Sequence, residues 1–583
     1  MKSKTVTGNW IVEETTELNE LVIEDGGSLE APEGKVLALS VDGMGYEAKP
    51  GYYFGDVVIT VAEPYLMQPA CIFRESGRVS RFRSAVTVID GEIVTEQSMT
   101  ALVVGGEVTG TYARGFSIQS IDPSFNGIIL DGNTDFTIEN AKIGFEGKGV
   151  NDFEGAGAGV TAIGNTKLLI KDSEITLSSQ TRCTIHAGGN SNVRVKDCRI
   201  TNDSPETGME PAWMLGLRGT NRAIQLCDKA SISFESCVLK GNGWGVLSVD
   251  GPEKVRMSLK DCLMELSGPR ARGYGAFVFG DCKAEFDHTV LNVKGYPILQ
   301  STENGLTEIK NGSRVIGDHY GAVIFKDESG EFILSGKSSM KIGRACFVVK
   351  GARTSIVVED SAVESKQGVI LQLMDNDEPG VTGDHFEVPV GEVDTPVEDR
   401  DLTTARVGED VFFTVRRSDL KGDFLNSSTE LRANLRTPAG SHFDLNDDAL
   451  NETMEGKEML VDEEFIAREN AGQGAKNLLV RLEMAGVTGR ISAAIQKYRY
   501  GLERIDEKTK FELSNVTQTP APPVNNGVIV YVDRDSKWIV TGKCWLTALE
   551  IEEGGVVVAE KMTVNGEVTP IAAGSYRGLI VIE

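Results

Sequence analysis

Residues whose side chains transfer protons or bind oxyanions recur in one stretch of the chain, each in a short apolar segment after a Gly-rich turn. Placing these segments in register brings the following residues near one face: His186, Arg218, Ser248, Asp250, Asp281 and Lys326. An aromatic residue begins successive segments: Trp213, Trp244, Tyr274, Tyr296 and Tyr320. Imidazole, carboxylate and phenol groups move protons, and a row of rings suits stacking on a sugar. The pattern predicts cofactor-independent acid/base chemistry on a sugar or polyhydroxylated small molecule.

The candidate catalytic residues are His186, Asp250, Tyr274 and Asp281. His186 or Tyr274 would abstract a proton in a lyase or isomerase, whereas Asp250 and Asp281 would serve glycoside cleavage if their separation fits. The candidate substrate-binding residues are Trp213, Arg218, Arg222, Trp244, Arg270, Arg272, His319, Tyr320 and Lys326. Arginine holds carboxylates and oxyanions well. The alternative interpretation is structural, because stacked rings also stabilise a solenoid and loop arginines are often only solvated.

Motifs for other chemistries are missing from the sequence. It contains no GxGxxG after a strand, no Walker loop, no HExxH and no GxSxG. Acidic phrases such as DNDEPG lack the alternating ligand spacing of an EF-hand. We therefore expect neither a cofactor nor a resident metal.

The elements that must position these residues are short strands in a repeat. A small residue preceded by Asp, Asn or Ser recurs about every 25 residues, which is the length of a three-stranded β coil. The markers are Asn140, Asp172, Asp197, Ser236, Asp261, Asp287, Asn311 and Asp360, with a degenerate coil around GEFILSGKSSMKIG. The alternating apolar residues of each strand point inward, and the residues between them form an outer face. The fold expected is all-β, a right-handed parallel β-helix.

Cysteine occupies the small position in three of these markers, Cys198, Cys237 and Cys262. Ser173 and Ser361 hold the same place in other coils. We expect an interior stack of small side chains rather than a metal or redox site, because stacking coils pack repeated small residues easily. The nine cysteines of the chain, without a CxxC pair, indicate reduced thiols.

The repeat is broken between residues 201 and 282, where two coils carry extra loops at about 201–212 and 264–273. Solenoid coils are structurally interchangeable, so insertions on one face commonly mark a binding site. We therefore place the candidate site in this region, with His186 one coil earlier.

The two ends of the chain contain a second repeat, since residues 10–27 align without gaps with residues 538–555. Two copies of one β module could cap the ends separately, pair with each other or contact another subunit, and we favour pairing. The predicted domains are an N-terminal β module and cap (1–110), the β-helix (111–382), a β-rich return segment (383–516) and a C-terminal β module (528–583) homologous to residues 8–63. Because exposed β edges invite pairing, homo-oligomerisation through the end modules is expected.

The formal net charge of -27 is spread along the chain. It disfavours nucleic acid and anionic lipid partners, and it would also repel a polyanionic polymer unless Ca²⁺ or a local basic groove intervened. The first residues lack the apolar core of a secretory signal, which favours a cytoplasmic protein.

Several phrases resemble the right-handed parallel β-helix repeat proteins of anaerobic bacteria. They are FNGIILDGNTDFTIENAKI, GVNDFEGAGAGVTAIGN, PAWMLGLRGTNRA, NGWGVLSVDG, APPVNNGVIV and SKWIVTGKCWLTALEI. The resemblance covers nearly the whole chain and implies the fold. Its better known relatives are polysaccharide lyases, hydrolases and isomerising transferases, and others grade into adhesin-like proteins. A non-catalytic carbohydrate-binding or adhesin-like protein is therefore the alternative to an enzyme.

Overall fold

The computed structural model describes residues 2–68, 79–149, 152–203, 222–251, 253–268, 273–325, 329–350, 353–374, 377, 385–387, 410–427, 432–434, 477–503, 505, 508–524 and 526–583. The chain divides into two compact units. The N-terminal unit comprises residues 1–209 and 219–268, and the C-terminal unit residues 210–218 and 269–583. The helices that the structure describes are single 3-10 turns, none with the length and apolar character needed to cross a membrane.

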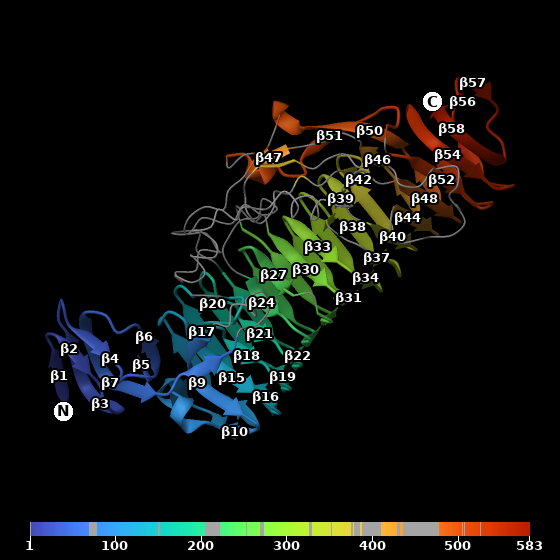
Figure 1. Ribbon diagram of the computed structural model, residues 1–583. Helices are drawn as coiled ribbons and strands as arrows, with labels where there is room; N and C mark the ends of the chain where they lie inside the picture. Colours follow the sequence, from blue (N-terminus) through green and yellow to red (C-terminus); the bar gives the residue numbers. More distant parts are fainter. Residues whose placement is uncertain are drawn as a thin grey trace. The chain divides into compact units, whose positions relative to one another are not determined.

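The coils of the N-terminal unit form a right-handed parallel β-helix, as the sequence predicts. One coil consists of β16 (Asp135–Glu139), β17 (Lys142–Glu146) and β18 (Val160–Ala162), and each strand pairs in parallel with its counterpart in the next coil. The later strands are β19 (Lys167–Lys171), β20 (Glu174–Ser178), β21 (Ile185–Ala187), β22 (Asn192–Lys196), β23 (Arg199–Asn202), β24 (Arg222–Leu226), β25 (Ser231–Glu235), β26 (Val238–Gly241), β27 (Gly245–Val249), β28 (Arg256–Lys260) and β29 (Leu263–Leu266). Figure 1 shows the resulting stack of strands.

The predicted marker residues form the turn between the first two strands of each coil. Asn140, Asp172, Asp197, Ser236 and Asp261 all have a φ between 51° and 54°. This left-handed conformation suits Asn and Asp, whose short side chains tolerate it. In the C-terminal unit the predicted markers Asn311 (φ 56°) and Asp360 (φ 45°) have the same conformation, but in one coil the turn residue is His288 (φ 49°) rather than the predicted Asp287. Lys337, with φ 63°, supplies the turn of the predicted degenerate coil.

The small residues after these turns form the buried stack that the sequence predicts. The Ser173 hydroxyl accepts a hydrogen bond from the backbone N–H of Ala141 (3.1 Å) and donates one to the carbonyl of Lys171 (2.7 Å). The Cys262 sulfur likewise accepts from the backbone N–H of Cys237 (3.4 Å). Each hydroxyl or thiol thus links one coil to the next, which gives a structural reason for Ser and Cys at this position.

The C-terminal unit continues the parallel coils well beyond residue 382. β44 (Val411–Arg416) pairs with β40 (Thr354–Glu359), and β48 (Leu478–Glu483) and β52 (Val528–Val532) extend the same sheet. The predicted boundary at 382 is therefore wrong, since residues 383–516 contribute strands of further coils. Long stretches of chain between these strands conceal the repeat period in the sequence.

The two end modules have the same fold, as their sequence similarity predicts. β3 (Thr16–Ile23) pairs antiparallel with β7 (Gly51–Ala62), and β54 (Cys544–Ile551) pairs antiparallel with β58 (Gly574–Ile582). Each pair is interrupted by a bulge at the equivalent place.

One tyrosine has the same role in each module. Tyr53 donates to the carbonyl of Lys49 (2.8 Å), and Tyr576 donates to that of Ala572 (2.9 Å). The sequence similarity thus extends to individual side-chain contacts.

Candidate functional site

The predicted outer row exists in the N-terminal unit, but it is buried. Thr161, His186, Gln225 and Ser248 lie side by side on β18, β21, β24 and β27, and none is exposed to solvent. The segment of residues 152–158 lies over His186. A Cβ on Gly155, whose φ is +75°, would lie 2.6 Å from Cγ of His186, so only glycine fits at this contact. The prediction of a solvent-exposed row is wrong here.

The covering segment is fixed to the coil by polar and apolar contacts that the sequence analysis missed. Arg182 is fully buried and donates to the carbonyls of Phe125 (2.7 Å), Gly157 (2.8 Å) and Glu146 (3.0 Å). Burial lowers its pKa to about 9. Ala156 packs in an apolar cluster whose other buried members are Tyr65, Met67, Phe82, Ile129, Ile163 and Cys227. The row therefore belongs to a second small core between the coil and the segment.

His186, the first predicted catalytic residue, cannot contact a substrate in this arrangement. His186 is 0% exposed, its Nδ1 has no hydrogen-bond partner among the described residues, and its Nε2 lies 4.0 Å from the Cys227 sulfur. Burial lowers the pKa of His186 to about 4, so the imidazole is neutral at pH 7. The burial of His186 favours a structural role in the core over its predicted role as a catalytic base.

Arg222, predicted to bind substrate, is instead used to hold two carboxylates. Its Nε and Nη2 donate to Asp152 (3.1 and 3.0 Å), and Nη1 donates to Asp250 (2.5 Å). The guanidinium lies 3.8 Å from the ring centre of Phe153 and 5.7 Å from that of Trp244. Since the side chain is only 2% exposed, Arg222 is a positioning residue. Asp152 was not among the predicted residues. In the sequence it is indicated only weakly, as a carboxylate inside a Gly-rich insertion.

Asp250 follows β27 and is held by one of its two carboxylate oxygens. Oδ2 accepts hydrogen bonds from Arg222 (2.5 Å), Gln225 Nε2 (2.5 Å) and Ser248 Oγ (3.1 Å). Oδ1 makes no hydrogen bond or ion pair with any residue that the structure describes, and the side chain is 13% exposed. A carboxylate held in this way presents one oxygen in a fixed direction, as a general base must.

Three residues of the predicted aromatic row, Tyr274, Tyr296 and Tyr320, are buried in the C-terminal unit. Tyr274, at the start of β30 (Tyr274–Gly280), is paired in register with Tyr296, at the start of β33 (Tyr296–Thr302). The ring of Tyr296 stacks on Tyr320, with 5.7 Å between centroids and an interplanar angle of 11°. All three are buried, which favours the structural interpretation for Tyr274 and Tyr296. Trp244 is also buried, in the N-terminal unit.

Tyr320 differs from the other rings of the stack because it lines a cavity. The cavity has a volume of about 160 Å³, and Arg344, Arg490 and Arg499 line it as well. Of the remaining predicted residues, Asp281 is half-buried in the turn after β30, and His319 is half-buried next to Tyr320. Five predictions lie outside the described residues: Trp213, Arg218, Arg270, Arg272 and Lys326.

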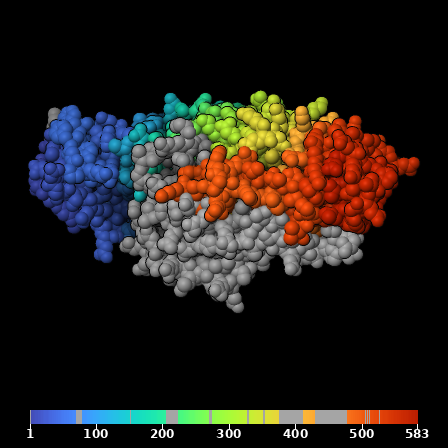
Figure 2. Space-filling view, turned by 90° about the horizontal axis from the view of Figure 1, so that it is seen from above, coloured from blue at the N-terminus to red at the C-terminus, as the bar shows by residue number. Residues whose placement is uncertain are grey.

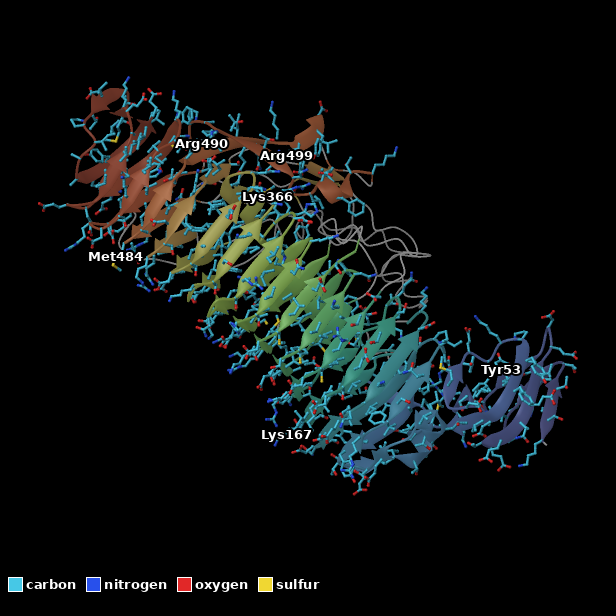
Figure 3. The ribbon with its side chains drawn as sticks, turned by 180° about the vertical axis from the view of Figure 1, so that it is seen from behind. Tyr53, Lys167, Lys366, Met484, Arg490 and Arg499 are labelled. Atoms are coloured by element: carbon cyan, nitrogen blue, oxygen red, sulfur yellow. The ribbon has the colours of Figure 1, made fainter. Side chains whose placement is uncertain are left out.

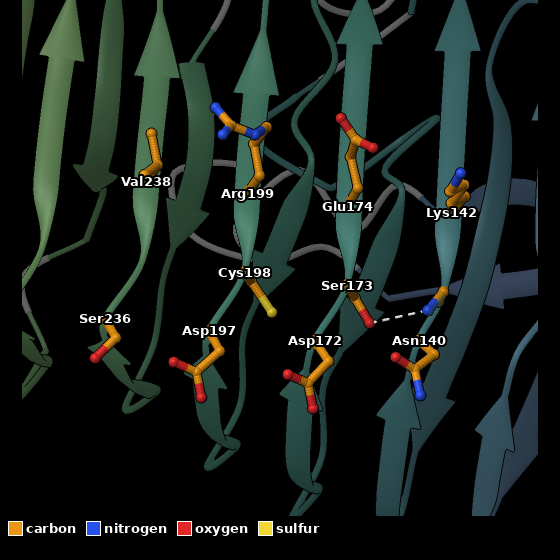
Figure 4. Close-up of a pocket in the computed structure, with 11 residues that line it drawn as sticks. Asn140, Lys142, Asp172, Ser173, Glu174, Asp197, Cys198, Arg199, Ser236 and Val238 are labelled. Atoms are coloured by element: carbon orange, nitrogen blue, oxygen red, sulfur yellow. Dashed lines mark hydrogen bonds between the residues drawn. The ribbon is translucent and has the colours of Figure 1, made fainter.

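An open groove of about 680 Å³ follows the turn column of the N-terminal unit. Figure 4 shows Asp172, Asp197 and Ser236 in adjacent coils, with Ser173 bonded to the neighbouring coil. Along its wall Lys142, Glu174 and Arg199 are paired in register, so charges of opposite sign alternate. Alternating charges stabilise neighbouring strands. We therefore interpret this groove as a structural surface.

Among the residues that the structure describes, no three His, Cys, Asp or Glu side chains are grouped so as to hold a metal ion. Comparison with known families gives one match, in which residues 101–265 match the model of the right handed beta helix region. No curated protein and no solved structure matches the chain.

Proposed function

We propose that the N-terminal unit carries out acid/base chemistry on a sugar or other polyhydroxylated small molecule, with Asp250 as the proton acceptor. The observation that carries the proposal is the convergence of three donors on Oδ2 of Asp250, which leaves Oδ1 available. Arg222, Gln225 and Ser248 act through Asp250 as positioning residues.

The architecture around Asp250 supports a role in which orientation matters. Asp152 holds the Arg222 guanidinium from the opposite side through two hydrogen bonds, and Phe153 packs on its face. A general base gains most when its oxygen is fixed before the substrate binds. The matched β-helix region is compatible with carbohydrate-active enzymes, and lyase, isomerase and glycoside-cleaving reactions all contain a proton transfer that one carboxylate can perform.

Hydrogen exchange with solvent tests the proposal whatever the product of the reaction is. The protein is incubated in D₂O with a panel of neutral sugars, sugar acids and polyols, and NMR detects deuterium incorporation or new products. We expect Asp250→Asn to lower the rate at least about tenfold, the lower end of what a positioned acid/base group contributes. The matched control is Asp135→Asn, which changes an exposed carboxylate on β16.

The same experiment separates an enzyme from a binding protein. Exchange or turnover at the wild-type rate in Asp250→Asn would refute the role of Asp250. Binding of a panel member without exchange, unchanged in Asp250→Asn, would favour the non-catalytic carbohydrate-binding alternative.

A further inference from the structure

The C-terminal unit contains a cavity of about 160 Å³ beside the predicted residue Tyr320. Its walls come from the starts of β39 (Ala345–Lys350), β42 (Val369–Met374) and β46 (Asp423–Ser427), and from β51 (Val516–Pro520). Figure 2 shows the segment around residue 500, in orange, along the surface of this unit beside the yellow strands. The cavity is therefore closed by chain far from Tyr320 in sequence.

The cavity is lined by more positive than negative charge. Three arginines are among the described lining residues, and of these Arg490 alone forms an ion pair with a described carboxylate, that of Asp423 (2.5 Å). Arg499 donates to Oε1 of Gln367 (2.7 Å) and to the carbonyl of Val516 (3.1 Å), and neither group carries charge. Lys366, Arg490 and Arg499 lie on the same side of this unit in Figure 3. In a chain of net charge -27, two cavity-lining arginines without an ion pair to a described residue, Arg344 and Arg499, favour an anionic ligand.

Arg344 is the second arginine of the cavity that forms no ion pair with a described residue, although the charge of Glu512 acts on it from a longer distance. Its guanidinium lies 5.8 Å from the ring centre of Tyr320, and it forms no ion pair with any described residue. The side chain is half-buried, so an anion reaching it would be partly shielded from water. Charge-assisted hydrogen bonds strengthen under such shielding.

Two buried polar atoms at this cavity form no hydrogen bond of good geometry with any residue that the structure describes. The Tyr320 hydroxyl is one, on a side chain only 2% exposed whose ring is fixed by stacking on Tyr296. Burial raises the pKa of Tyr320, although Arg344 opposes the shift, so the phenol remains a donor. The other is Oε1 of Gln518, whose Nε2 donates to Ser427 Oγ (2.6 Å) and the Leu373 carbonyl (3.0 Å). Buried polar atoms are normally satisfied, so these two point to a missing partner.

We propose that this cavity binds a small hydroxy carboxylic acid. The carboxylate is bound by Arg344 and Arg499, with the Tyr320 hydroxyl donating to it. A hydroxyl group of the ligand donates to Oε1 of Gln518. Because this oxygen only accepts hydrogen bonds, it cannot bind a carboxylate oxygen of the ligand. The volume suits one small molecule rather than a polymer segment. This site is independent of Asp250 and goes beyond the acid/base function proposed above.

Isothermal titration calorimetry of the full chain tests the ligand class with D-gluconate and D-glycerate as probes. Sorbitol supplies hydroxyls without charge, hexanoate supplies a carboxylate without hydroxyls, and sulfate supplies an oxyanion alone. We expect at least one hydroxy acid to bind at least about tenfold more tightly than all three controls, since each lacks one charged or buried hydrogen bond. Equal binding of sulfate would overturn the hydroxy-acid assignment, and failure of both hydroxy acids to bind would overturn the site.

Variants then locate the binding. Arg344→Gln should weaken binding of the hydroxy acid at least about tenfold, and Tyr320→Phe about three- to tenfold, because it removes one hydroxyl and keeps the ring. Arg314→Gln changes an exposed arginine of β35 (Arg314–Gly317) outside the cavity and should leave the affinity unchanged. Wild-type affinity in both cavity variants would place the ligand elsewhere and refute the proposal.

Discussion

The N-terminal and C-terminal units each place an arginine against an aromatic ring and polar side chains, with opposite results. Arg222 is buried and paired with Asp152 and Asp250, whereas Arg344 is half-buried beside Tyr320 and forms no ion pair with a described carboxylate. The first arrangement satisfies its charge internally and fixes a neighbouring carboxylate. The second leaves charge and a buried hydroxyl unsatisfied, which costs stability and provides binding capacity. An arginine whose polar partners lie within the protein therefore has a positioning role, whereas an arginine without such partners can bind a ligand, although the residue type is the same.

The largest expected change in the free energy of unfolding follows from removing Arg222, whose charge is paired inside the protein. Arg222→Met leaves Asp152 fully buried without its partner, and breaking a buried ion pair in this way costs about 3–5 kcal/mol. Chemical denaturation measures the change in the free energy of unfolding. Arg194→Met, an exposed arginine on β22, is the control and should change it by less than about 0.5 kcal/mol. A similar decrease in the free energy of unfolding in both variants would contradict the stabilising role of the buried Arg222 ion pairs.

The second largest expected effect is the dependence of the free energy of unfolding on pH that His186 causes. Its pKa falls from 6.5 in the unfolded chain to about 4 in the fold, because burial disfavours the charged imidazole. The unfolded chain therefore takes up the proton first, so the stabilisation is complete above pH 6.5 and is lost as the pH falls from 6.5 to 4. The expected loss is about 3 kcal/mol.

Denaturation at several pH values measures this loss, with His186→Gln as the comparison. The variant should have a smaller slope between pH 6.5 and 4, because the titrating group has been removed. An unchanged slope would show that other groups dominate in that pH window.

The smallest expected change in the free energy of unfolding concerns Tyr320 in the C-terminal unit. Tyr320→Phe removes a hydroxyl that forms no well-aligned hydrogen bond with a described residue, so the free energy of unfolding should change by less than about 0.5 kcal/mol or rise. Tyr498→Phe is the matched control, because the buried Tyr498 hydroxyl donates to Asp377 (3.2 Å), and its loss should cost about 1–3 kcal/mol. A large destabilisation by Tyr320→Phe would mean that its hydroxyl already has a partner in the protein.

The β-helix, the turn residues and the duplicated end modules could be predicted because each depends on local or repeated sequence. Asn140, Asp172 and Asp197 recur because the left-handed turn needs such residues in every coil. Strand alternation likewise determines which side chains leave the coil interior, and it correctly places His186 and Ser248 in one row.

Tertiary structure alone decided which of those outward residues reach solvent. Residues 152–158 return over His186, held by Arg182, and no repeat in the sequence predicts the direction of an insertion. The cavity at Tyr320 is closed by Gln518 on β51, a contact of long sequence separation that strand patterning does not reveal. Local periodicity determines where a side chain points, but burial and ligand access depend on which distant segment packs against it.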